Sequence, residues 1–438
     1  MPGASTNGHP RALDVDAGDH SAGQLRLAIV GSVDDGKSTL IGRLLFDSKQ
    51  IFQDQLEHVE ETSRRRGDGY VNLALLTDGL RAEREQGITI DVAHRYFATP
   101  NRRFVIADTP GHIQYTRNMV TGAANADVAV ILIDARNGVV EQTRRHAYIA
   151  SLVGIRHLVA CVNKMDLVGF HEAAFEAVAA DFRELANKLS IPDITLIPVS
   201  ALNGDNVVDR SGEMPWYQGP PLLHHLERVR VASDRNLFEV RFPVQYVIRP
   251  MSDEHHDYRG YAGQLASGVL HRGDDVVVLP AGHHTRVKKL DTFDGELNEV
   301  FPPQSVTVLL EDDLDVSRGD MLVSPADSPQ PARRLAATLC WMAEQPLVPR
   351  GKYVIRHTTR EARAIVEEIT HKIDMHTLEQ VTDVSNLELN DIGAVKLRLS
   401  SPLVVDDYRR NRQTGSFILI DEATNATVGA GMITGADS

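Results

Sequence analysis

The stretch GSVDDGKS, residues 31–38, decides the fold. It matches the pattern GxxxxGK[ST] and stands between an apolar run, residues 25–30, and a helical pattern, residues 37–46. A glycine-rich turn between a strand and a helix wraps its backbone N–H groups around phosphate oxygens, and the helix N-terminus adds partial positive charge. The sequence therefore predicts an α/β domain whose first loop binds the phosphates of a nucleotide.

The residue types in this loop predict how the phosphates are held. Lys37 is expected to reach the β- and γ-phosphates and to act in catalysis, and the Ser38 hydroxyl is expected to ligate Mg²⁺. Backbone flexibility at the two glycines permits the wrapped conformation. The residues expected to contact phosphate in this loop are Gly31, Ser32, Val33, Asp34, Asp35, Gly36, Lys37, Ser38 and Thr39.

A second motif, DTPGH at residues 108–112, follows another predicted strand. A carboxylate at Asp108 would hold the magnesium ion directly or through water, and the Gly111 N–H would meet the γ-phosphate. His112 is the candidate for positioning the attacking water, since phosphoryl transfer depends mainly on orientation and charge stabilisation. Thr89, in REQGITID, would complete the magnesium shell and release its loop after hydrolysis, as a switch residue does.

A third motif, NKMD at residues 163–166, predicts guanine rather than adenine. The Asp166 carboxylate would accept hydrogen bonds from the guanine N1–H and 2-amino group, which adenine lacks, and a buried carboxylate without those donors would be left unpaired. Asn163 is expected to bond the base edge and tie loops together, and the Lys164 stem to pack over the ring. The backbone N–H groups of Ser200, Ala201 and Leu202 would close the pocket. The expected cofactors are GTP and Mg²⁺.

The chain is long enough for about three domains. Apolar strands alternate with amphipathic helices up to about residue 221, which predicts a doubly wound, mostly parallel sheet with a hairpin at one edge. Shorter β runs then follow at intervals typical of small barrels, apart from one helix expected around residues 359–369. The predicted organisation is a disordered arm, a P-loop domain and two β-barrels, at residues 1–24, 25–233, 234–326 and 332–438.

The composition argues against nucleic-acid binding and membrane association. The net charge is −14 and no basic stripe stands out, so a nucleic-acid partner has no support. No apolar run approaches the 18 or more residues of a membrane helix, and no membrane association is expected. The two cysteines, Cys161 and Cys340, form no metal or disulfide pattern, which favours a reducing, cytoplasmic setting.

The motifs together with two barrels resemble the translation-factor class of GTPases. Within that class, several stretches are similar to the large, GTPase subunit of bacterial sulfate adenylyltransferase. They include GSVDDGKSTLIGRLLFDSKQIFQDQLE (31–57), LLTDGLRAEREQGITIDVAHRYF (75–97), DTPGHIQYTRNMVTGAANADVAVILIDARNGV (108–139), LNDIGAVKLRLSSPLVVDDY (389–408) and NRQTGSFILIDEATNATVGAGMI (411–433).

This resemblance implies a GTPase that works with a smaller catalytic partner subunit. The partner would transfer the adenylyl group of ATP to sulfate, giving adenosine 5′-phosphosulfate and pyrophosphate, and GTP hydrolysis would drive this uphill step. Coupling of this kind requires two states that bias each other. Some members of the family carry a fused kinase, but no second GxxxxGK[ST] pattern occurs up to Ser438, so no kinase activity is expected.

The alternative is a translation GTPase that binds tRNA or the ribosome. Elongation factors that carry aminoacyl-tRNA usually have histidine where this chain has Ser32 and Asp35, and arginine where it has Gln86. These departures count against the alternative. The Asp35 carboxylate also places an extra negative charge near the phosphates. It is expected to point away or to interact with a partner, and the sequence does not distinguish the two.

Overall fold

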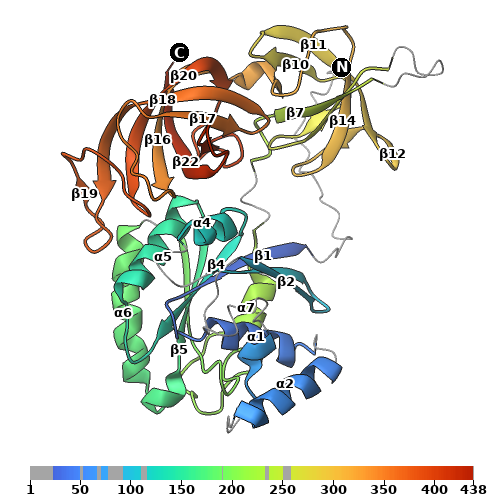
Figure 1. The fold of residues 1–438 in the computed structure, drawn as a ribbon. Helices are drawn as coiled ribbons and strands as arrows, with labels where there is room; N and C mark the ends of the chain where they lie inside the picture. Colours follow the sequence, from blue (N-terminus) through green and yellow to red (C-terminus); the bar gives the residue numbers. More distant parts are fainter. Residues whose placement is uncertain are drawn as a thin grey trace, which may run out of the picture.

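The computed structural model describes residues 23–49, 53–66, 71–76, 92–109, 116–189, 191–231, 236–249 and 258–437. The described part consists of an α/β domain and two β-barrels, and Figure 1 shows the barrels side by side above the α/β domain. The predicted arm lies outside the described residues as far as residue 22. The exact domain boundaries stay predictions.

The α/β domain is built on one six-stranded sheet with the order β2-β3-β1-β4-β5-β6. Its strands are β1 (Gln24–Val30), β2 (Ala93–Ala98), β3 (Arg103–Asp108), β4 (Val128–Asp134), β5 (His157–Asn163) and β6 (Asp193–Pro198). All neighbours pair in parallel except the edge pair β2–β3, which is the predicted antiparallel hairpin. Its helices are α1 (Lys37–Asp47), α2 (Gln53–Arg66), α4 (Thr116–Ala124), α5 (Glu141–Leu152), α6 (Glu172–Lys188) and α7 (Leu222–Arg228).

Alternating apolar residues bury both faces of this sheet. In β1, Leu27 and Ile29 pack with α1 and α7, whereas Ala28 and Val30 pack with the core that holds α4, α5 and α6. Every residue of β4 is buried. A strand covered by helices on both faces has no solvent-facing side, and this explains its continuous apolar run. The two cysteines are free and buried, as small apolar residues would be.

Each barrel is a seven-stranded sheet that is closed by pairing of one end strand with the penultimate strand at the other end. The first barrel contains β7 (Arg241–Ile248), β8 (Gly260–Gln264), β10 (Asp275–Leu279), β11 (His283–Thr292), β12 (Gly295–Leu297), β14 (Ser305–Leu310) and β15 (Met321–Val323). A separate two-stranded sheet pairs β9 (Leu270–His271) with β13 (Glu299–Val300). The second barrel contains β16 (Pro331–Trp341), β17 (Lys352–His357), β18 (Arg360–Ile373), β19 (Gln380–Val381), β20 (Ile392–Val404), β21 (Ser416–Ile420) and β22 (Thr427–Asp437). The closing pairs are β10–β11 and β17–β18. Closure removes the unpaired edges that an open sheet would expose.

The helix expected around residues 359–369 is wrong, because this segment is strand β18. Its residues are good helix formers, but Ala362, Ala364 and Val366 are buried at a spacing of two, which is the period of a strand. Pairing with β17 and β20 on both sides outweighs local propensity. Helix α2 lies between α1 and β2, in a stretch where the sequence predicted no helix.

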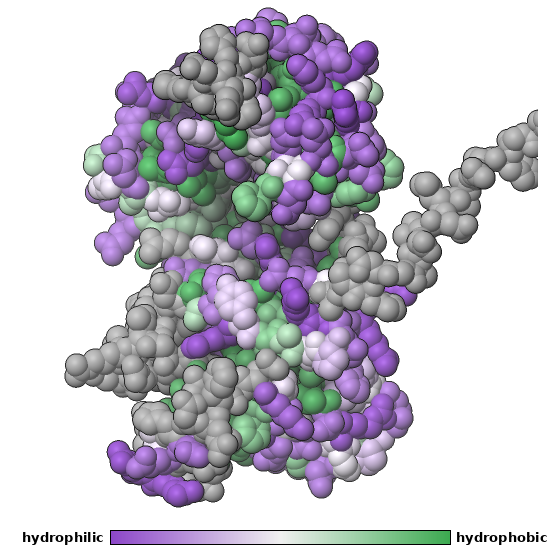
Figure 2. Space-filling view, turned by 90° about the vertical axis from the view of Figure 1, so that its right-hand side faces the viewer, coloured by the Kyte–Doolittle hydropathy of each residue, from purple (hydrophilic) through white to green (hydrophobic). Residues whose placement is uncertain are grey.

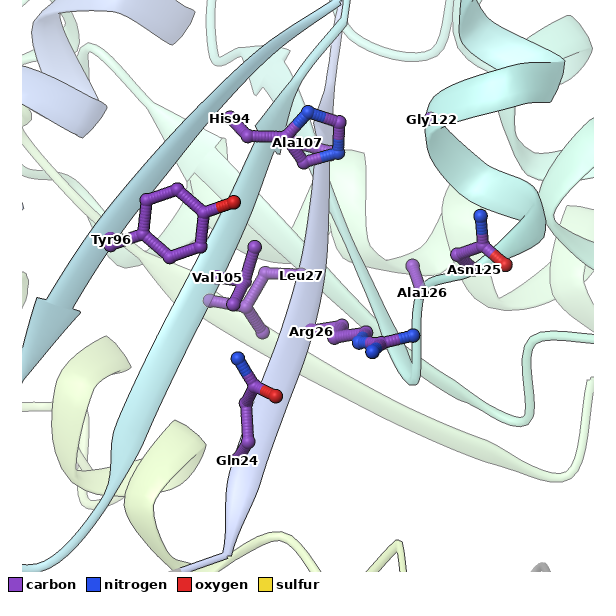
Figure 3. Close-up of a pocket in the computed structure, with 10 residues that line it drawn as sticks. All are labelled: Gln24, Arg26, Leu27, His94, Tyr96, Val105, Ala107, Gly122, Asn125 and Ala126. Carbon is purple, nitrogen blue, oxygen red and sulfur yellow. The ribbon is translucent and has the colours of Figure 1, made fainter. Parts of the chain in front are cut away.

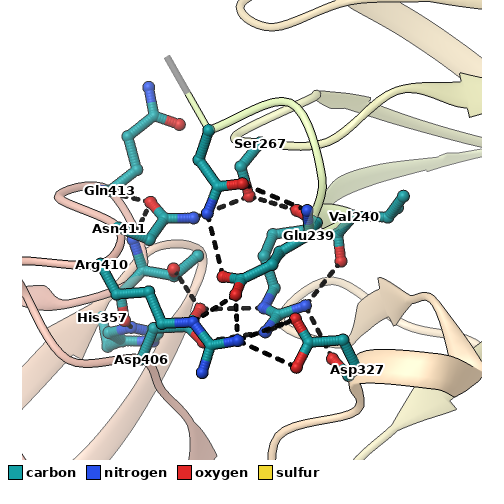
Figure 4. A network of polar contacts seen from close by, with 12 residues as sticks. Glu239, Val240, Ser267, Asp327, His357, Asp406, Arg410, Asn411 and Gln413 are labelled. Carbon is teal, nitrogen blue, oxygen red and sulfur yellow. Dashed lines mark hydrogen bonds and ion pairs between the residues drawn. The ribbon is translucent and has the colours of Figure 1, made fainter. Parts of the chain in front are cut away.

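A buried ion pair joins the two barrels. The Arg241 guanidinium donates from Nε and Nη2 to both oxygens of Asp406, each over 2.9 Å, and both side chains are almost completely buried. Thr414 Oγ1 donates to the same carboxylate over 2.5 Å. Figure 4 shows the surrounding network, in which Arg410 contacts Asp327. The polar groups of this junction therefore satisfy one another within the protein.

The second barrel also contacts the α/β domain. Tyr408 Oη donates to the Val153 carbonyl over 2.9 Å, directly after α5. Cys340 and Ile392 of the barrel share a hydrophobic core with α5. The second barrel therefore packs directly against α5. None of the helices in the described part of the chain is long and apolar enough to cross a membrane.

Candidate nucleotide-binding site

The phosphate-binding loop joins β1 to α1, as the sequence predicts. Two of its residues have positive φ, Asp34 at 67° and Gly36 at 93°. A Cβ atom at Gly36 would lie 2.5 Å from Nδ2 of Asn163, so a larger residue would both strain the backbone and collide with the base motif. The glycine of the first motif thus permits close approach of the third.

Lys37 lies inside this loop. Its Nζ donates to the carbonyls of Gly31 over 2.8 Å and Ser32 over 2.9 Å, and the residue is only 7% exposed. Burial lowers the pKa of the ammonium, and the carboxylates of Asp108 and Asp35 oppose that shift. An ammonium held across the loop in this way is placed to meet phosphate oxygens.

Asp35 is expected from the sequence to point away or to meet a partner, but its side chain turns into the phosphate loop. Its Oδ2 accepts a hydrogen bond from the Ser32 N–H over 2.7 Å, and the residue is 5% exposed. Burial raises the pKa of the carboxyl, while the Ser32 N–H and the Lys37 ammonium favour the charged form. Asp35 therefore caps the loop from within instead of facing a partner.

Asn163 connects the loop that reads the base to the loop that holds phosphate. Its Nδ2 donates to the Asp35 carbonyl over 2.7 Å, and its Oδ1 accepts from the Ala201 N–H over 2.9 Å. The side chain is 2% exposed, so water does not compete for these bonds. The predicted tie between the loops is present in these hydrogen bonds.

Lys164 makes a second connection to the phosphate loop. Its Nζ contacts the Asp34 carbonyl and lies 2.9 Å from Oδ2 of Asp134. Asp134 also pairs with Arg136 over 2.6 Å. Burial alone would raise the pKa of Asp134, but hydrogen bonds from Arg136 and Lys164 hold it below its usual range. The charged end of Lys164 is thus fixed, and its aliphatic stem runs between the two motifs.

Asp166 and Ser200 form the candidate base-reading pair. Ser200 Oγ donates to Asp166 Oδ1 over 2.6 Å, which leaves Oδ2 of the same carboxylate for a ligand. The Ser200 N–H is bonded to the Asp205 carbonyl and the Ala201 N–H to Asn163, so the Leu202 N–H is the loop amide without a partner among the described residues. Of the three amides expected to close the pocket, Leu202 is the best placed.

Ser38 and Asp108 provide the hard oxygen donors that magnesium prefers. Ser38 lies in the first turn of α1, and Asp108 is the last residue of β3 and 2% exposed. The neighbouring Thr109 donates its hydroxyl to the Ile29 carbonyl over 2.9 Å, which fixes the end of β3 against β1 beside the phosphate loop. This donor set fits Mg²⁺. The other predicted residues, Thr89, Gly111 and His112, lie outside the described residues.

Sequence reasoning missed Asp134 and Arg43, which contact the predicted motifs. Asp134 ends β4 at the same sheet edge as Asp108 and Asn163, and this position could have identified it. Arg43 lies on α1 and contacts the loop at residues 201–202, but its position in the sequence gives no such signal. Long-range side-chain contacts of this kind become visible only in three dimensions.

The α/β domain also carries a pocket of about 220 Å³ at the opposite end of β1. Figure 3 shows Gln24 and Arg26 of β1 beside His94 and Tyr96 of β2 in its lining. The phosphate loop follows the other end of the strand, whereas the pocket lining includes Ala107, which directly precedes Asp108 of the second motif. Figure 2 shows that hydrophilic side chains cover much of one side of the molecule, with a waist between the α/β domain and the barrels.

Known proteins match this chain over nearly its whole length. Residues 24–247 match the family described as Elongation factor Tu GTP binding domain, and residues 334–434 match the GTP-eEF1A C-terminal domain-like family. The bifunctional enzyme CysN/CysC of Mycobacterium tuberculosis (strain ATCC 25618 / H37Rv) is 57% identical over 93% of this chain and 67% of that protein. Sulfate adenylyltransferase subunit 1 of Bacteroides fragilis (strain YCH46) is 53% identical over 93% of this chain and 85% of that protein.

A solved structure of sup35 complexed with GMPPNP is 24% identical, covers 96% of this chain and 95% of its own, and has a TM-score of 0.44. Of the two relatives named above, the chain spans about two thirds of the length of the bifunctional enzyme and most of the length of subunit 1.

Proposed function

Because the chain belongs to the sulfate adenylyltransferase subunit 1 family of elongation-factor-Tu-type GTPases, we propose that its GTP hydrolysis drives sulfate activation on a partner subunit. The protein is the GTPase-containing subunit of a sulfate adenylyltransferase. Its partner would join ATP and sulfate into adenosine 5′-phosphosulfate and pyrophosphate. The observation that carries the nucleotide assignment is the direct bonding between the phosphate loop and the NKMD motif, through Asn163 and Lys164.

The described residues support separate roles in binding phosphate, guanine and Mg²⁺. Lys37 and the amides between Gly31 and Thr39 that are not bonded within the loop would bind phosphate oxygens, whereas the Ser32 N–H is bonded to Asp35. Asp166 with the Leu202 N–H would read guanine. Ser38 and Asp108 would hold Mg²⁺, with Thr89 completing the set. The ion would neutralise charge on the β- and γ-phosphates when bound. Asn163 and Lys164 would keep the two halves of the site in register.

The translation alternative has less support than the sulfate-activation proposal. Relatives named as sulfate adenylyltransferase subunit 1 are 50–53% identical over 93% of the chain, including its second barrel. No residue in the described part of the site favours a tRNA or ribosome partner over the catalytic subunit of a sulfate adenylyltransferase. Binding of aminoacyl-tRNA would be the result that revives the alternative.

The test measures GTP hydrolysis by the purified chain alone and with the small subunit, ATP and sulfate. We expect the rate to rise when all are present and adenosine 5′-phosphosulfate to accumulate in parallel. Omitting sulfate is the matched control, because it removes the acceptor and leaves every protein in place. Stimulation by ribosomes or aminoacyl-tRNA, with no response to ATP and sulfate, would contradict the proposed function.

Substitution of His112 with alanine is expected to leave GTP binding close to wild type and to slow hydrolysis by about 10²-fold. The reason is that the side chain is proposed to orient water and not to hold the nucleotide. Single-turnover kinetics under saturating GTP measure the hydrolysis rate, and equilibrium titration measures the affinity for GTP. Equal hydrolysis rates in the two proteins would remove His112 from the mechanism.

A further inference from the structure

Arg43 contacts the loop of the proposed guanine pocket from helix α1. Its Nε donates to the Ala201 carbonyl over 3.3 Å, and its Nη2 contacts the Leu202 carbonyl. Its Nη1 lies 3.6 Å from Oδ1 of Asp47, one turn further along the helix. The side chain is 17% exposed. Each of the three nitrogens therefore has a partner, and the guanidinium is held in one orientation.

These contacts fix the direction of two peptide groups. In a planar trans peptide the C=O and the following N–H point in opposite directions. Because Arg43 holds the Ala201 carbonyl towards α1, the Leu202 N–H points away from α1. Likewise, the Leu202 carbonyl faces Arg43, and the Asn203 N–H on the other side donates to Ser200 Oγ over 3.3 Å.

The 202–203 peptide is connected through Ser200 to the Asp166 carboxylate, which is proposed to read the base. Ser200 Oγ accepts from the Asn203 N–H and donates its own proton to Asp166 Oδ1. A hydroxyl with both a donor and an acceptor in place has a defined orientation. The orientation of Asp166 thus depends, through Ser200 and the 202–203 peptide, on a side chain of α1.

We propose that Arg43 is a positioning residue for guanine recognition, which orients the Leu202 N–H and the Ser200–Asp166 pair from the helix that begins at the phosphate loop. This inference rests on the proposed GTP site. It assigns guanine selectivity partly to a residue that touches neither base nor phosphate. Asp47 contributes by holding the guanidinium in place.

Lysine could not take over this function. A guanidinium is a rigid planar fork with five N–H donors, whereas the lysine ammonium is a single point on a flexible stem. One ammonium cannot hold the carbonyls of Ala201 and Leu202 and the carboxylate of Asp47 in the same directions. Arg43→Lys therefore keeps the charge and loses the geometry.

The test compares GTP with purine riboside 5′-triphosphate, which keeps the phosphates but lacks the 6-oxo group, the N1–H and the 2-amino group. For Arg43→Ala we expect the Kd for GTP to rise about 30-fold, with little change for the analogue, since the analogue does not use the oriented donors and acceptor. Arg43→Lys should fall between wild type and Arg43→Ala. Arg183→Ala is the matched control, because that arginine lies on α6 in an exposed ion pair with Glu176 and should bind both nucleotides like wild type.

Equal losses for GTP and the analogue would overturn the inference, because they would indicate a general structural role. Unchanged GTP binding in Arg43→Ala would overturn it as well. If Arg43→Ala does not fold, Asp47→Asn and Arg43→Lys decide by the same ratio of dissociation constants. A wild-type chain that does not bind GTP would instead contradict the proposed function, and this separates the two failures.

Discussion

Replacing Asp166 with asparagine is expected to reverse the base preference of the site, changing the ratio of GTP to XTP affinity by about 10⁴-fold. Ser200 Oγ donates to Oδ1 of Asp166 over 2.6 Å, so an asparagine at this position would turn its carbonyl oxygen to Ser200 and its NH₂ group to the base. The NH₂ group would then face the 2-amino group of guanine, donor against donor. Xanthine has an oxygen there and would accept the hydrogen bond.

Equilibrium titration with both nucleotides measures this change. Asp181→Asn is the control, because Asp181 is an exposed carboxylate on α6 and its replacement makes the same charge change away from the site. A proportional loss of affinity for GTP and XTP would show that Asp166 only stabilises the loop. Retained GTP preference would show that another group reads the 2-amino position.

Replacing Arg241 with alanine is expected to lower the free energy of unfolding of the barrel pair by about 3–5 kcal/mol. The substitution leaves the Asp406 carboxylate buried with only the Thr414 hydroxyl of its present side-chain donors. A buried charge without its counter-charge costs far more than an exposed ion pair contributes. The paired change Arg241→Met with Asp406→Leu should recover most of the stability, because it removes both charges together.

Chemical denaturation followed by the fluorescence of Trp341, which is buried in the second barrel, would measure the loss. Arg409→Ala provides the matched control, since that arginine is exposed and adjacent to Arg410 of the same network. A loss below about 1 kcal/mol for Arg241→Ala would mean that water reaches the junction and screens Asp406.

The sequence predicted the α/β domain well because its signals are local. Buried parallel strands have continuous apolar runs, and the motifs stand directly at their carboxyl ends, as β5 and Asn163 illustrate. The confirmed antiparallel hairpin has its turn signal at Pro100 and Asn101. In these segments, the residue propensities, the spacing of the apolar residues and the turn residues all indicate the same structure.

Prediction failed where a distant partner decides the local structure. Strand β18 has a helix-forming composition, and only pairing with β17 and β20 makes it extended. Arg43 and Arg241 looked like ordinary charged residues, because their partners lie roughly 160 positions away in the chain. The inward turn of Asp35 depends on a hydrogen bond whose geometry the one-dimensional pattern does not contain.

The contact between Gly36 and Asn163 has a consequence for how such a site can evolve. A Cβ at position 36 would lie 2.5 Å from the Asn163 amide, so position 36 cannot accept a larger residue while Asn163 stays where it is. A chain that changes Gly36 of its phosphate loop must therefore also shift Asn163, which bonds that loop to the base motif. The residue that one motif can accept thus depends on the side chain present in the other.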